Sequence, residues 1–374
     1  MNSRLGRDIK MKRILELDVL RVLALIFVIF QHATWWFVDR YPEFRSSLNF
    51  LFLGDLGVSF FIILSGCALT LSGSRNYSVA TFYKKRFLSI IPSYWVAYLL
   101  VTILLFSING SFFADFKLKK VLATIFAMDG WLSSAGFQTY YRIGEWFTGF
   151  ILLVYAVAPF IIFLVKKKPF TTILILTIIS YLSVHFNDAL VNTLRYWSHF
   201  PYCNPTARLA EFSIGVLLGL MILDNKFFNQ RICFFLLSGL GSGLLLLMAN
   251  KYDGLRFVFY TSFFIFLLLA LNLIKVLINS SNNVKKILKE FIPSLTFFSS
   301  LSFLAFLYHH QIILLLVQRL PLPGNTSQGV NFISYGLLVF ATFCLSYILA
   351  YFSLPIVNEV KGIAKSFMFR NNKS

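Results

Sequence analysis

The chain has little charge and no polar stretch long enough to separate two domains. Only 13% of its 374 residues are Asp, Glu, Lys or Arg, against roughly 25% in a soluble globular domain. It also has no Gly/Ser-rich or Pro-rich linker. These absences exclude a soluble multidomain protein and predict one integral-membrane domain over residues 1–374.

Acidic residues are scarce, with 15 Asp and Glu against 34 Lys and Arg, which gives a formal net charge of +19. Such an excess would suit nucleic acid, but the basic residues recur at the ends of apolar segments and form no continuous face. This distribution is typical of topology signals that also attract anionic lipids. We therefore expect membrane lipids as partners and no nucleic acid.

The sequence lacks the patterns that hold a metal or a nucleotide in a soluble fold. Its four cysteines show no metal-ligand spacing, and it has no Gly-rich phosphate loop; the cysteines are Cys67, Cys203, Cys233 and Cys344. We expect no metal site and no permanently bound cofactor. A phosphorylated substrate would have to be held by basic side chains and helix ends.

Long apolar segments are abundant: 58% of the residues are hydrophobic, and the mean hydropathy is +0.74. Windows of about 20 residues predict about ten transmembrane helices, an all-α polytopic membrane protein. The predicted spans are roughly 17–38, 49–71, 88–108, 146–165, 170–186, 208–224, 232–249, 256–275, 296–318 and 331–357.

The basic residues also predict the orientation. With the N-terminus inside, the inner connections hold roughly twice as many Lys and Arg residues as the outer ones. The first apolar segment exceeds the length of a signal-peptide core, so we expect it to remain as a helix. We predict a multi-pass protein of the inner (cytoplasmic) cell membrane with both termini cytoplasmic.

One connection, residues 109–145, is unusually long, and its apolar piece Val121 to Met128 is too short to cross a bilayer. We expect this piece to dip into or lie along the outer surface, near the site.

Two ionisable residues interrupt the first apolar segment. Arg21 and His32 are eleven residues apart, which places them on one helix face about 16 Å apart along the axis. Ionisable side chains at membrane depth cost at least about 2.5–3.5 kcal/mol at the helix centre, so they commonly mark a functional path. We predict a site within the membrane at these residues.

Six short motifs extend from this helix over residues 17–310. They are Leu17-Asp18-Val19-Leu20-Arg21 with His32, Gly57-Val58-Ser59-Phe60-Phe61 with Ser65-Gly66, Phe82-Tyr83-Lys84-Lys85-Arg86 with Pro92-Ser93-Tyr94-Trp95, Trp146-Phe147 with Tyr155 and Pro159, Arg208-Leu209-Ala210-Glu211-Phe212 with Gly215, and Ser302 to Leu307 with His309-His310. In content and order they resemble the membrane-bound acyltransferase family 3, whose members modify surface polysaccharides, lipids and other extracytoplasmic acceptors.

The resemblance implies that His32 and Arg21 are catalytic. His32 would act as a general base towards an acceptor hydroxyl, or as a covalent acyl carrier. Arg21 would hold a phosphate or a carboxylate, or else extend to the cytoplasmic interface.

The resemblance also implies an acyl-CoA site on the inner side. Lys84, Lys85 and Arg86 are the candidates for binding its phosphates, although they could be a plain topology signal. Many relatives carry an Arg-x-x-Arg pair there, whereas Ser89 follows Arg86 in this chain, and Ile151 stands where some relatives have a glutamate. The chain is more similar to stand-alone polysaccharide acetyltransferases, without an added extracytoplasmic domain.

Further candidates concern the acceptor. Glu145 and Trp146 could recognise a sugar, although an aromatic belt would also explain the tryptophan. His309, with His310 and Ser302, would line the passage. Arg208 and Glu211 could belong to the acceptor pocket, but we favour a structural ion pair, and for Ser65 beside Gly66 we favour close helix packing.

The predicted activity is transfer of an acetyl group from cytoplasmic acetyl-CoA to a hydroxyl of a cell-surface polysaccharide or its lipid-linked glycan precursor. Transfer of another small acyl group such as succinyl is the nearest alternative. A glycan or solute transporter would also have about ten spans and buried charges, but matching inverted repeats are not evident.

Overall fold

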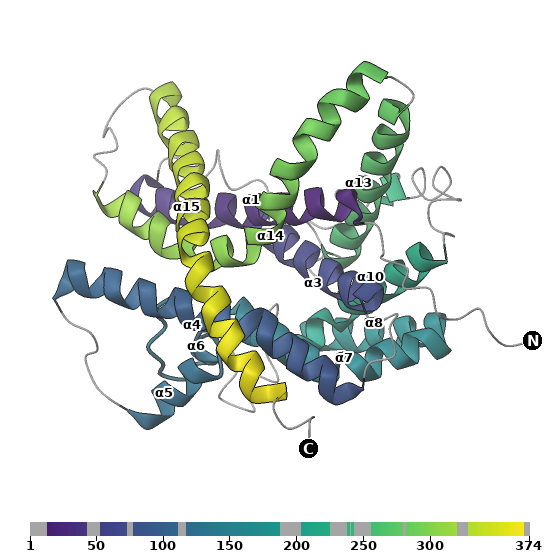
Figure 1. The fold of residues 1–374 in the computed structure, drawn as a ribbon, viewed down its shortest axis with the longest axis horizontal. Helices are drawn as coiled ribbons and strands as arrows, with labels where there is room; N and C mark the ends of the chain where they lie inside the picture. Colours follow the sequence, from purple (N-terminus) through teal and green to yellow (C-terminus); the bar gives the residue numbers. More distant parts are fainter. Residues whose placement is uncertain are drawn as a thin grey trace, which may run out of the picture.

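A computed structural model gives the structure of the chain and describes residues 13–42, 53–72, 78–110, 117–187, 203–224, 238–239, 241–242, 256–279, 282–319 and 328–369. All regular elements of these described residues are helices, which confirms the predicted all-α class. In chain order they are α1 (Leu15–Arg40), α3 (Leu53–Ser72), α4 (Val79–Asn109), α5 (Leu118–Ile125), α6 (Asp129–Ser134), α7 (Phe147–Lys167), α8 (Pro169–His185), η3 (Pro205–Arg208), α10 (Leu209–Leu223), α13 (Arg256–Asn279), α14 (Asn282–Arg319) and α15 (Gln328–Phe369) (Figure 1).

Eight helices of the described part are long and apolar enough to cross a membrane, so this is a multi-pass membrane protein. They are α1, α3, α4, α7, α10 with the turn η3 before it, α13, α14 and α15. Predicted span 170–186 corresponds to α8, an apolar helix of 17 residues that falls short of this length. Predicted span 232–249 lies almost wholly outside the described residues.

Several helices extend well beyond their apolar spans. Helix α4 begins at Val79 because the hydroxyl of Ser78 caps it, accepting a hydrogen bond from the Thr81 backbone N–H at 3.2 Å. Helix α14 begins at Asn282. Hydropathy detects only the apolar part of such a helix, which is why the sequence placed these starts at 88 and 296.

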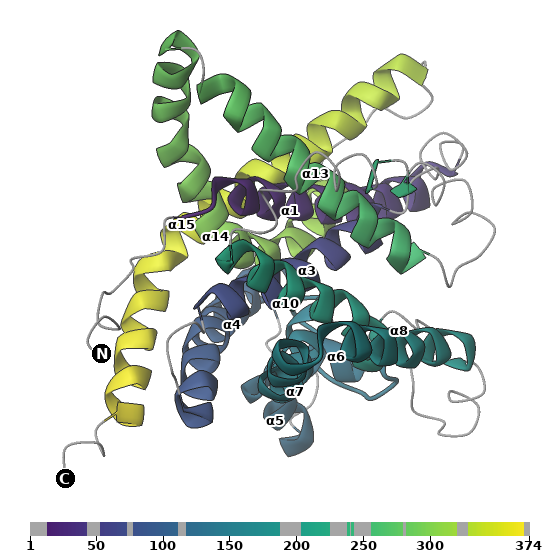
Figure 2. The ribbon, with the colours of Figure 1, turned by 90° about the vertical axis from the view of Figure 1, so that its right-hand side faces the viewer.

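Five helices form the centre of the bundle. Helix α3 packs against α1 and α10, and α14 packs against α1 and α15 (Figures 1 and 2). A Cβ atom added at Gly66 would collide with the carbonyl oxygen of Phe212, and one at Gly215 with that of Ile63. Glycine therefore permits the close approach of α3 and α10, in agreement with the predicted packing role for Gly66, whereas Ser65 beside it lines a cavity.

Helices α1 and α14 lie side by side and run in the same direction. Arg21 of α1 donates a hydrogen bond to the Ser299 hydroxyl at 3.0 Å, and further along both helices His32 lies 2.7 Å from His309. Arg21 and His32 thus both face α14, as expected for residues on one side of a helix.

The connection between α4 and α7 contains two short helices. Helix α5 has eight residues and α6 has six, so neither can span a bilayer, as predicted for Val121 to Met128. The carboxylate of Asp129 is buried and accepts hydrogen bonds from the Tyr98 hydroxyl at 3.3 Å and the Tyr140 backbone N–H at 3.2 Å. These bonds fasten to α4 the segment that leads to Glu145.

Candidate active site

Three histidines and one glutamate meet between α1, α14 and the residue pair that precedes α7. In this His–Glu cluster, formed by His32, Glu145, His309 and His310, the Nδ1 atom of His32 lies 2.7 Å from Nε2 of His309. The Oε1 atom of Glu145 lies 3.2 Å from His309 Nε2, 3.8 Å from His32 Nδ1 and 4.0 Å from His310 Nε2. His32 and His309 are therefore in direct contact. Glu145, which we expected at the outer mouth of the helix that follows it, lies in the same cluster.

The backbone around Gly144 brings Glu145 into the cluster. Gly144 has φ +83°, a left-handed conformation that favours glycine. A Cβ atom there would lie 3.0 Å from Nδ1 of His310, so a larger residue would also crowd the histidine. The next residue of α14 is Gln311, whose side chain donates a hydrogen bond to the Arg142 carbonyl at 2.6 Å and so fixes this segment against the helix.

Glu145 is 4% exposed and, among the residues that the structure describes, meets no Lys or Arg side chain. In the described part of the chain its charged contacts are histidines alone. Its buried Oε1 atom has no hydrogen-bond partner there. Burial raises the pKa of the Glu145 carboxyl well above its usual range. A positive charge arriving beside it would favour the ionised form.

The hydrogen bonds of the histidines define which nitrogen is available for chemistry. Nδ1 of His309 contacts the carbonyl oxygen of Phe306, an atom that can only accept, so Nδ1 carries the hydrogen and Nε2 of neutral His309 is an acceptor. Nδ1 of His32 then donates to that Nε2. The lone pair of His32 is left on its own Nε2, which makes no hydrogen bond within the described residues.

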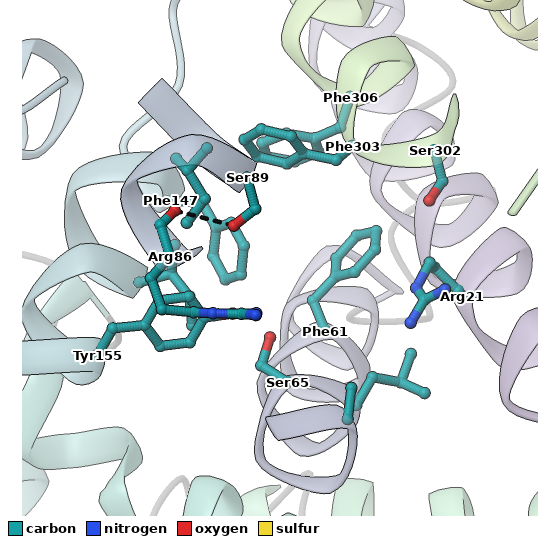
Figure 3. A pocket seen from close by; sticks show the side chains of 14 residues that line it. Arg21, Phe61, Ser65, Arg86, Ser89, Phe147, Tyr155, Ser302, Phe303 and Phe306 are labelled. Carbon is teal, nitrogen blue, oxygen red and sulfur yellow. Dashed lines mark hydrogen bonds between the residues drawn. The ribbon is translucent and has the colours of Figure 1, made fainter. Parts of the chain in front are cut away.

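A cavity of about 270 Å³ lies beyond Phe306, which lines it and packs against His309; none of the four cluster residues is among its lining residues. Arg21 and Arg86 enter it from opposite sides, with Ser65 between them (Figure 3). The Nε atom of Arg86 is buried and has no hydrogen-bond partner among the described residues. An unsatisfied guanidinium nitrogen beside a second arginine makes this cavity suitable for an anionic ligand.

Aromatic rings connect the cavity with the cluster. Phe61, Phe147 and Phe306 line the cavity, and their ring centroids lie 5.6 to 5.9 Å apart. We call these three residues the aromatic trio. The Phe306 ring also lies 5.2 Å from the His309 ring. A ligand that extends from the arginines to the histidines therefore passes an apolar wall.

Arg21 is held within the protein and does not simply extend to an interface. Besides its bond to Ser299, it lies 3.4 Å from a carboxylate oxygen of Asp18. The same oxygen accepts a hydrogen bond from Ser299 at 2.6 Å. Asp18 and Ser299, to which the sequence analysis gave no role, orient the arginine at the cavity.

Of the three basic residues predicted to bind phosphate, only Arg86 lines the cavity. Lys84 donates a hydrogen bond to the Met368 carbonyl at 2.7 Å, and its ammonium lies 4.9 Å from the centre of the Phe369 ring. It therefore fastens α4 to the end of α15. Lys85 does not line the cavity either.

The remaining predicted residues pack in other parts of the bundle. Arg208 and Glu211 are buried and form an ion pair at 3.0 Å, and Glu211 also accepts a hydrogen bond from Ser59 of α3 at 2.7 Å. This geometry supports the favoured structural role. Trp146 packs edge-on against Phe147 and Phe150 and does not line the cavity.

Comparison with known families gives one match, which extends over nearly the whole chain. The family model described as an acyltransferase domain matches residues 14–351. This range includes both arginines of the cavity and all four residues of the His–Glu cluster. Comparisons with curated proteins and with solved structures returned no match.

Proposed function

Because the chain belongs to acyltransferase family 3, we propose that it moves an acetyl group from cytoplasmic acetyl-CoA to a hydroxyl of a cell-surface polysaccharide or its lipid-linked precursor. Membership of the family identifies the chain as an acyltransferase. One observation supports the finer assignment: a cavity with two arginines is connected, through Phe306 and His309, to His32, whose Nε2 is free to accept a proton.

The cavity suits the donor. Guanidinium groups bind phosphate oxygens through paired, charge-assisted hydrogen bonds, and Arg86 has a buried N–H without an acceptor. A volume of about 270 Å³ holds only part of an acyl-CoA, so we expect the nucleotide to extend beyond it. The arm that carries the thioester would then pass the aromatic trio towards His32.

The chemistry is one exchange of bonds at the thioester carbonyl. Nε2 of His32 takes the proton of the acceptor hydroxyl as that oxygen bonds to the acyl carbon and the carbon–sulfur bond breaks. The imidazolium then gives the proton to the departing CoA thiolate. Glu145, whose Oε1 lies 3.8 Å from His32 Nδ1, stabilises the transient positive charge.

His309 acts as a positioning residue. By accepting from Nδ1 of His32, it keeps the lone pair of His32 on Nε2, much as a carboxylate does in a serine-protease triad. The apolar wall of the aromatic trio limits water at the thioester, which reduces competing hydrolysis.

Trp35 is the candidate for contact with the acceptor. Its ring lies 5.0 Å from that of His32, it is 55% exposed, and it does not line the arginine cavity. An exposed aromatic face beside the base suits a sugar ring, which has apolar C–H faces as well as hydroxyls. Trp35 was not among the acceptor residues predicted from the sequence, which were Glu145, Trp146, Arg208, Glu211 and His309.

The same geometry favours acetyl over succinyl. A succinyl group would bring a carboxylate to the acyl end of the donor, beside the buried Glu145 carboxyl, and burial of an unpaired charge is costly. In the described residues no Lys or Arg pairs with Glu145 to compensate that charge. The transporter alternative has no support beyond the number of spans, since the family match is to acyltransferases.

The proposed location is the cytoplasmic membrane with both termini inside, because basic residues are concentrated in the connections assigned to that side. Arg21 and Arg86 then lie towards the compartment that supplies acetyl-CoA.

The test is mass spectrometry of surface glycan from cells with and without the chain. We expect a mass increment of one acetyl group per modified sugar only in cells that contain it. A mass increment of one succinyl group would mean that the donor is succinyl-CoA and not acetyl-CoA. An unchanged mass of both the surface glycan and the lipid-linked glycan would contradict the proposal.

A further inference from the structure

The His–Glu cluster also has the donor atoms of a zinc site. Its core consists of His32 Nδ1, His309 Nε2 and Glu145 Oε1, separated by 2.7, 3.2 and 3.8 Å. Zinc binds such atoms at about 2.0–2.2 Å in tetrahedral geometry, so its ligands lie roughly 3.3–3.6 Å apart. Small side-chain movements would place all three atoms on one cation. Two histidines and one glutamate are also a ligand set of known zinc enzymes.

The surroundings of these atoms favour a cation. Oε1 of Glu145 is buried without a hydrogen-bond partner among the described residues, and a divalent cation would satisfy it. Nδ1 of His309 contacts the Phe306 carbonyl. Metal-binding histidines commonly donate their second N–H to such an oxygen, which leaves the other nitrogen free to coordinate.

The fourth position and the approach of the ion also follow from the geometry. Nε2 of His310 lies 4.0 Å from the same Glu145 oxygen but outside the three-residue group, so the fourth position is left to water. The side chains of His32 and His310 are 11% and 18% exposed. An ion can therefore reach the cluster without unfolding of the bundle.

We propose that His32, Glu145 and His309 bind a zinc-class divalent cation, and that the bound cation inhibits acyl transfer. Neutral imidazole has one lone pair. If Nδ1 of His32 coordinates the metal, its hydrogen must be on Nε2, the nitrogen that would otherwise accept the hydroxyl proton. Binding of the ion stands on the geometry alone, whereas inhibition rests on the proposed function.

Binding is tested on the purified full chain in detergent, with zinc chloride alone as the probe. Calorimetry should give one zinc ion per chain, and zinc should raise the midpoint of thermal unfolding by mass action. Cobalt chloride provides a readout that needs no variant, because a tetrahedral nitrogen and oxygen site gives intense visible absorption bands, unlike hydrated cobalt. Absence of both zinc binding and these bands would overturn the proposal.

Variants then locate the ion. Glu145→Gln and His309→Ala should each weaken zinc binding by roughly 10- to 100-fold or more, since loss of even an outer hydrogen bond has that effect. His185→Ala is the matched control, because His185 lies on α8, exposed and outside the cluster. Unchanged affinity in both cluster variants, or an equal loss in His185→Ala, would contradict the site. The thermal midpoint without zinc shows whether a variant has folded.

Inhibition has its own experiment. Zinc should stop acetyl transfer by the unmodified chain at the concentrations that saturate the calorimetric site, and a chelator should restore it. Full activity with the site saturated would overturn the inhibitory role. If the unmodified chain transfers no acetyl group even without zinc, the proposed function has failed, and the binding experiments still decide on the ion.

Discussion

The bundle contains two buried groups of ionisable side chains, which differ in how their carboxylates are paired. Between α3 and α10, an oxygen of Glu211 accepts hydrogen bonds from Arg208 and Ser59 at 3.0 and 2.7 Å. Between α1 and α14, the corresponding oxygen of Glu145 has no hydrogen bond in the described residues and faces histidines. The first group is closed and the second is open to an additional ligand or proton.

This difference in pairing distinguishes a carboxylate that stabilises the fold from one that can take part in a reaction. A buried carboxylate with its cation and hydrogen bonds already in place has little to offer a substrate, and it fixes helices together. A buried carboxylate beside imidazoles can respond to a charge that forms during a reaction. The comparison therefore supports a structural role for the Arg208–Glu211 pair and agrees with the catalytic role that we propose for the His–Glu cluster.

Replacement of the proposed base should have the largest effect. His32→Ala should lower acetyl transfer by roughly 10²- to 10⁴-fold, the usual contribution of general-base catalysis, without change in the amount of protein in the membrane. Glycan acetylation, normalised to membrane protein, measures it. His185→Ala is the control for loss of a histidine elsewhere and should retain activity. An equal loss of acetyl transfer in both variants would contradict a specific role for His32.

The closed pair should respond in the opposite way. Arg208→Ala leaves Glu211 buried without its cation, which should lower the free energy of unfolding by about 3–5 kcal/mol. Thermal unfolding in detergent should show a clearly lower midpoint. Glu145→Gln should change this midpoint far less, because no hydrogen bond to Oε1 is lost. Equal destabilisation by the two variants would make both groups structural.

Loss of one arginine of the proposed donor site should have an intermediate effect. Arg86→Ala removes hydrogen bonds to a charged group, which contribute about 1.5–3 kcal/mol, so the KM for acetyl-CoA should rise roughly 10- to 100-fold. Lys84→Ala is the matched comparison, since Lys84 is a neighbouring cation that binds the end of α15. It should raise the donor KM less. A larger rise in the donor KM from Lys84→Ala than from Arg86→Ala would favour the phosphate site predicted from the sequence, which included Lys84.

The smallest effect is expected at the acceptor side. Trp35→Ala should raise the KM for glycan by roughly 2- to 10-fold, because an aromatic contact contributes about 0.5–1.5 kcal/mol. The donor KM should not change. Trp35→Phe keeps an aromatic face and should recover most of the affinity. If both variants bind glycan as the unmodified chain does, Trp35 has no part in acceptor recognition.

The sequence predicted the membrane fold well because each spanning helix is visible as one continuous apolar stretch of about 20 residues. Eight of the predicted spans correspond to helices of sufficient length in the described residues. It failed at helix ends: a cap at Ser78 stabilises the polar start of α4, and α14 begins before its apolar part, neither of which an apolar window detects.

The site was predictable only in part. Arg21 and His32 stand out because charge inside an apolar helix is costly. The association of Glu145 with His309 depends on the approach of the segment after α6 to α14, a contact between residues more than 160 positions apart. In the sequence, only the glycine before Glu145 pointed to this approach, since glycine readily adopts the left-handed backbone conformation that Gly144 has. The exclusion of Lys84 from the cavity depends on the path of α15.

The central claim is that His32 is the base of an acetyl transfer across the membrane. Its most direct test uses the purified chain in liposomes, with radiolabelled acetyl-CoA on the cytoplasmic side and glycan on the other. We predict that the unmodified chain labels the glycan without stable label on the protein, and that His32→Ala, folded and able to bind acetyl-CoA, labels neither. Near-normal glycan labelling by His32→Ala would contradict the claim, and stable label on His32 of the unmodified chain would replace the base with a covalent acyl carrier.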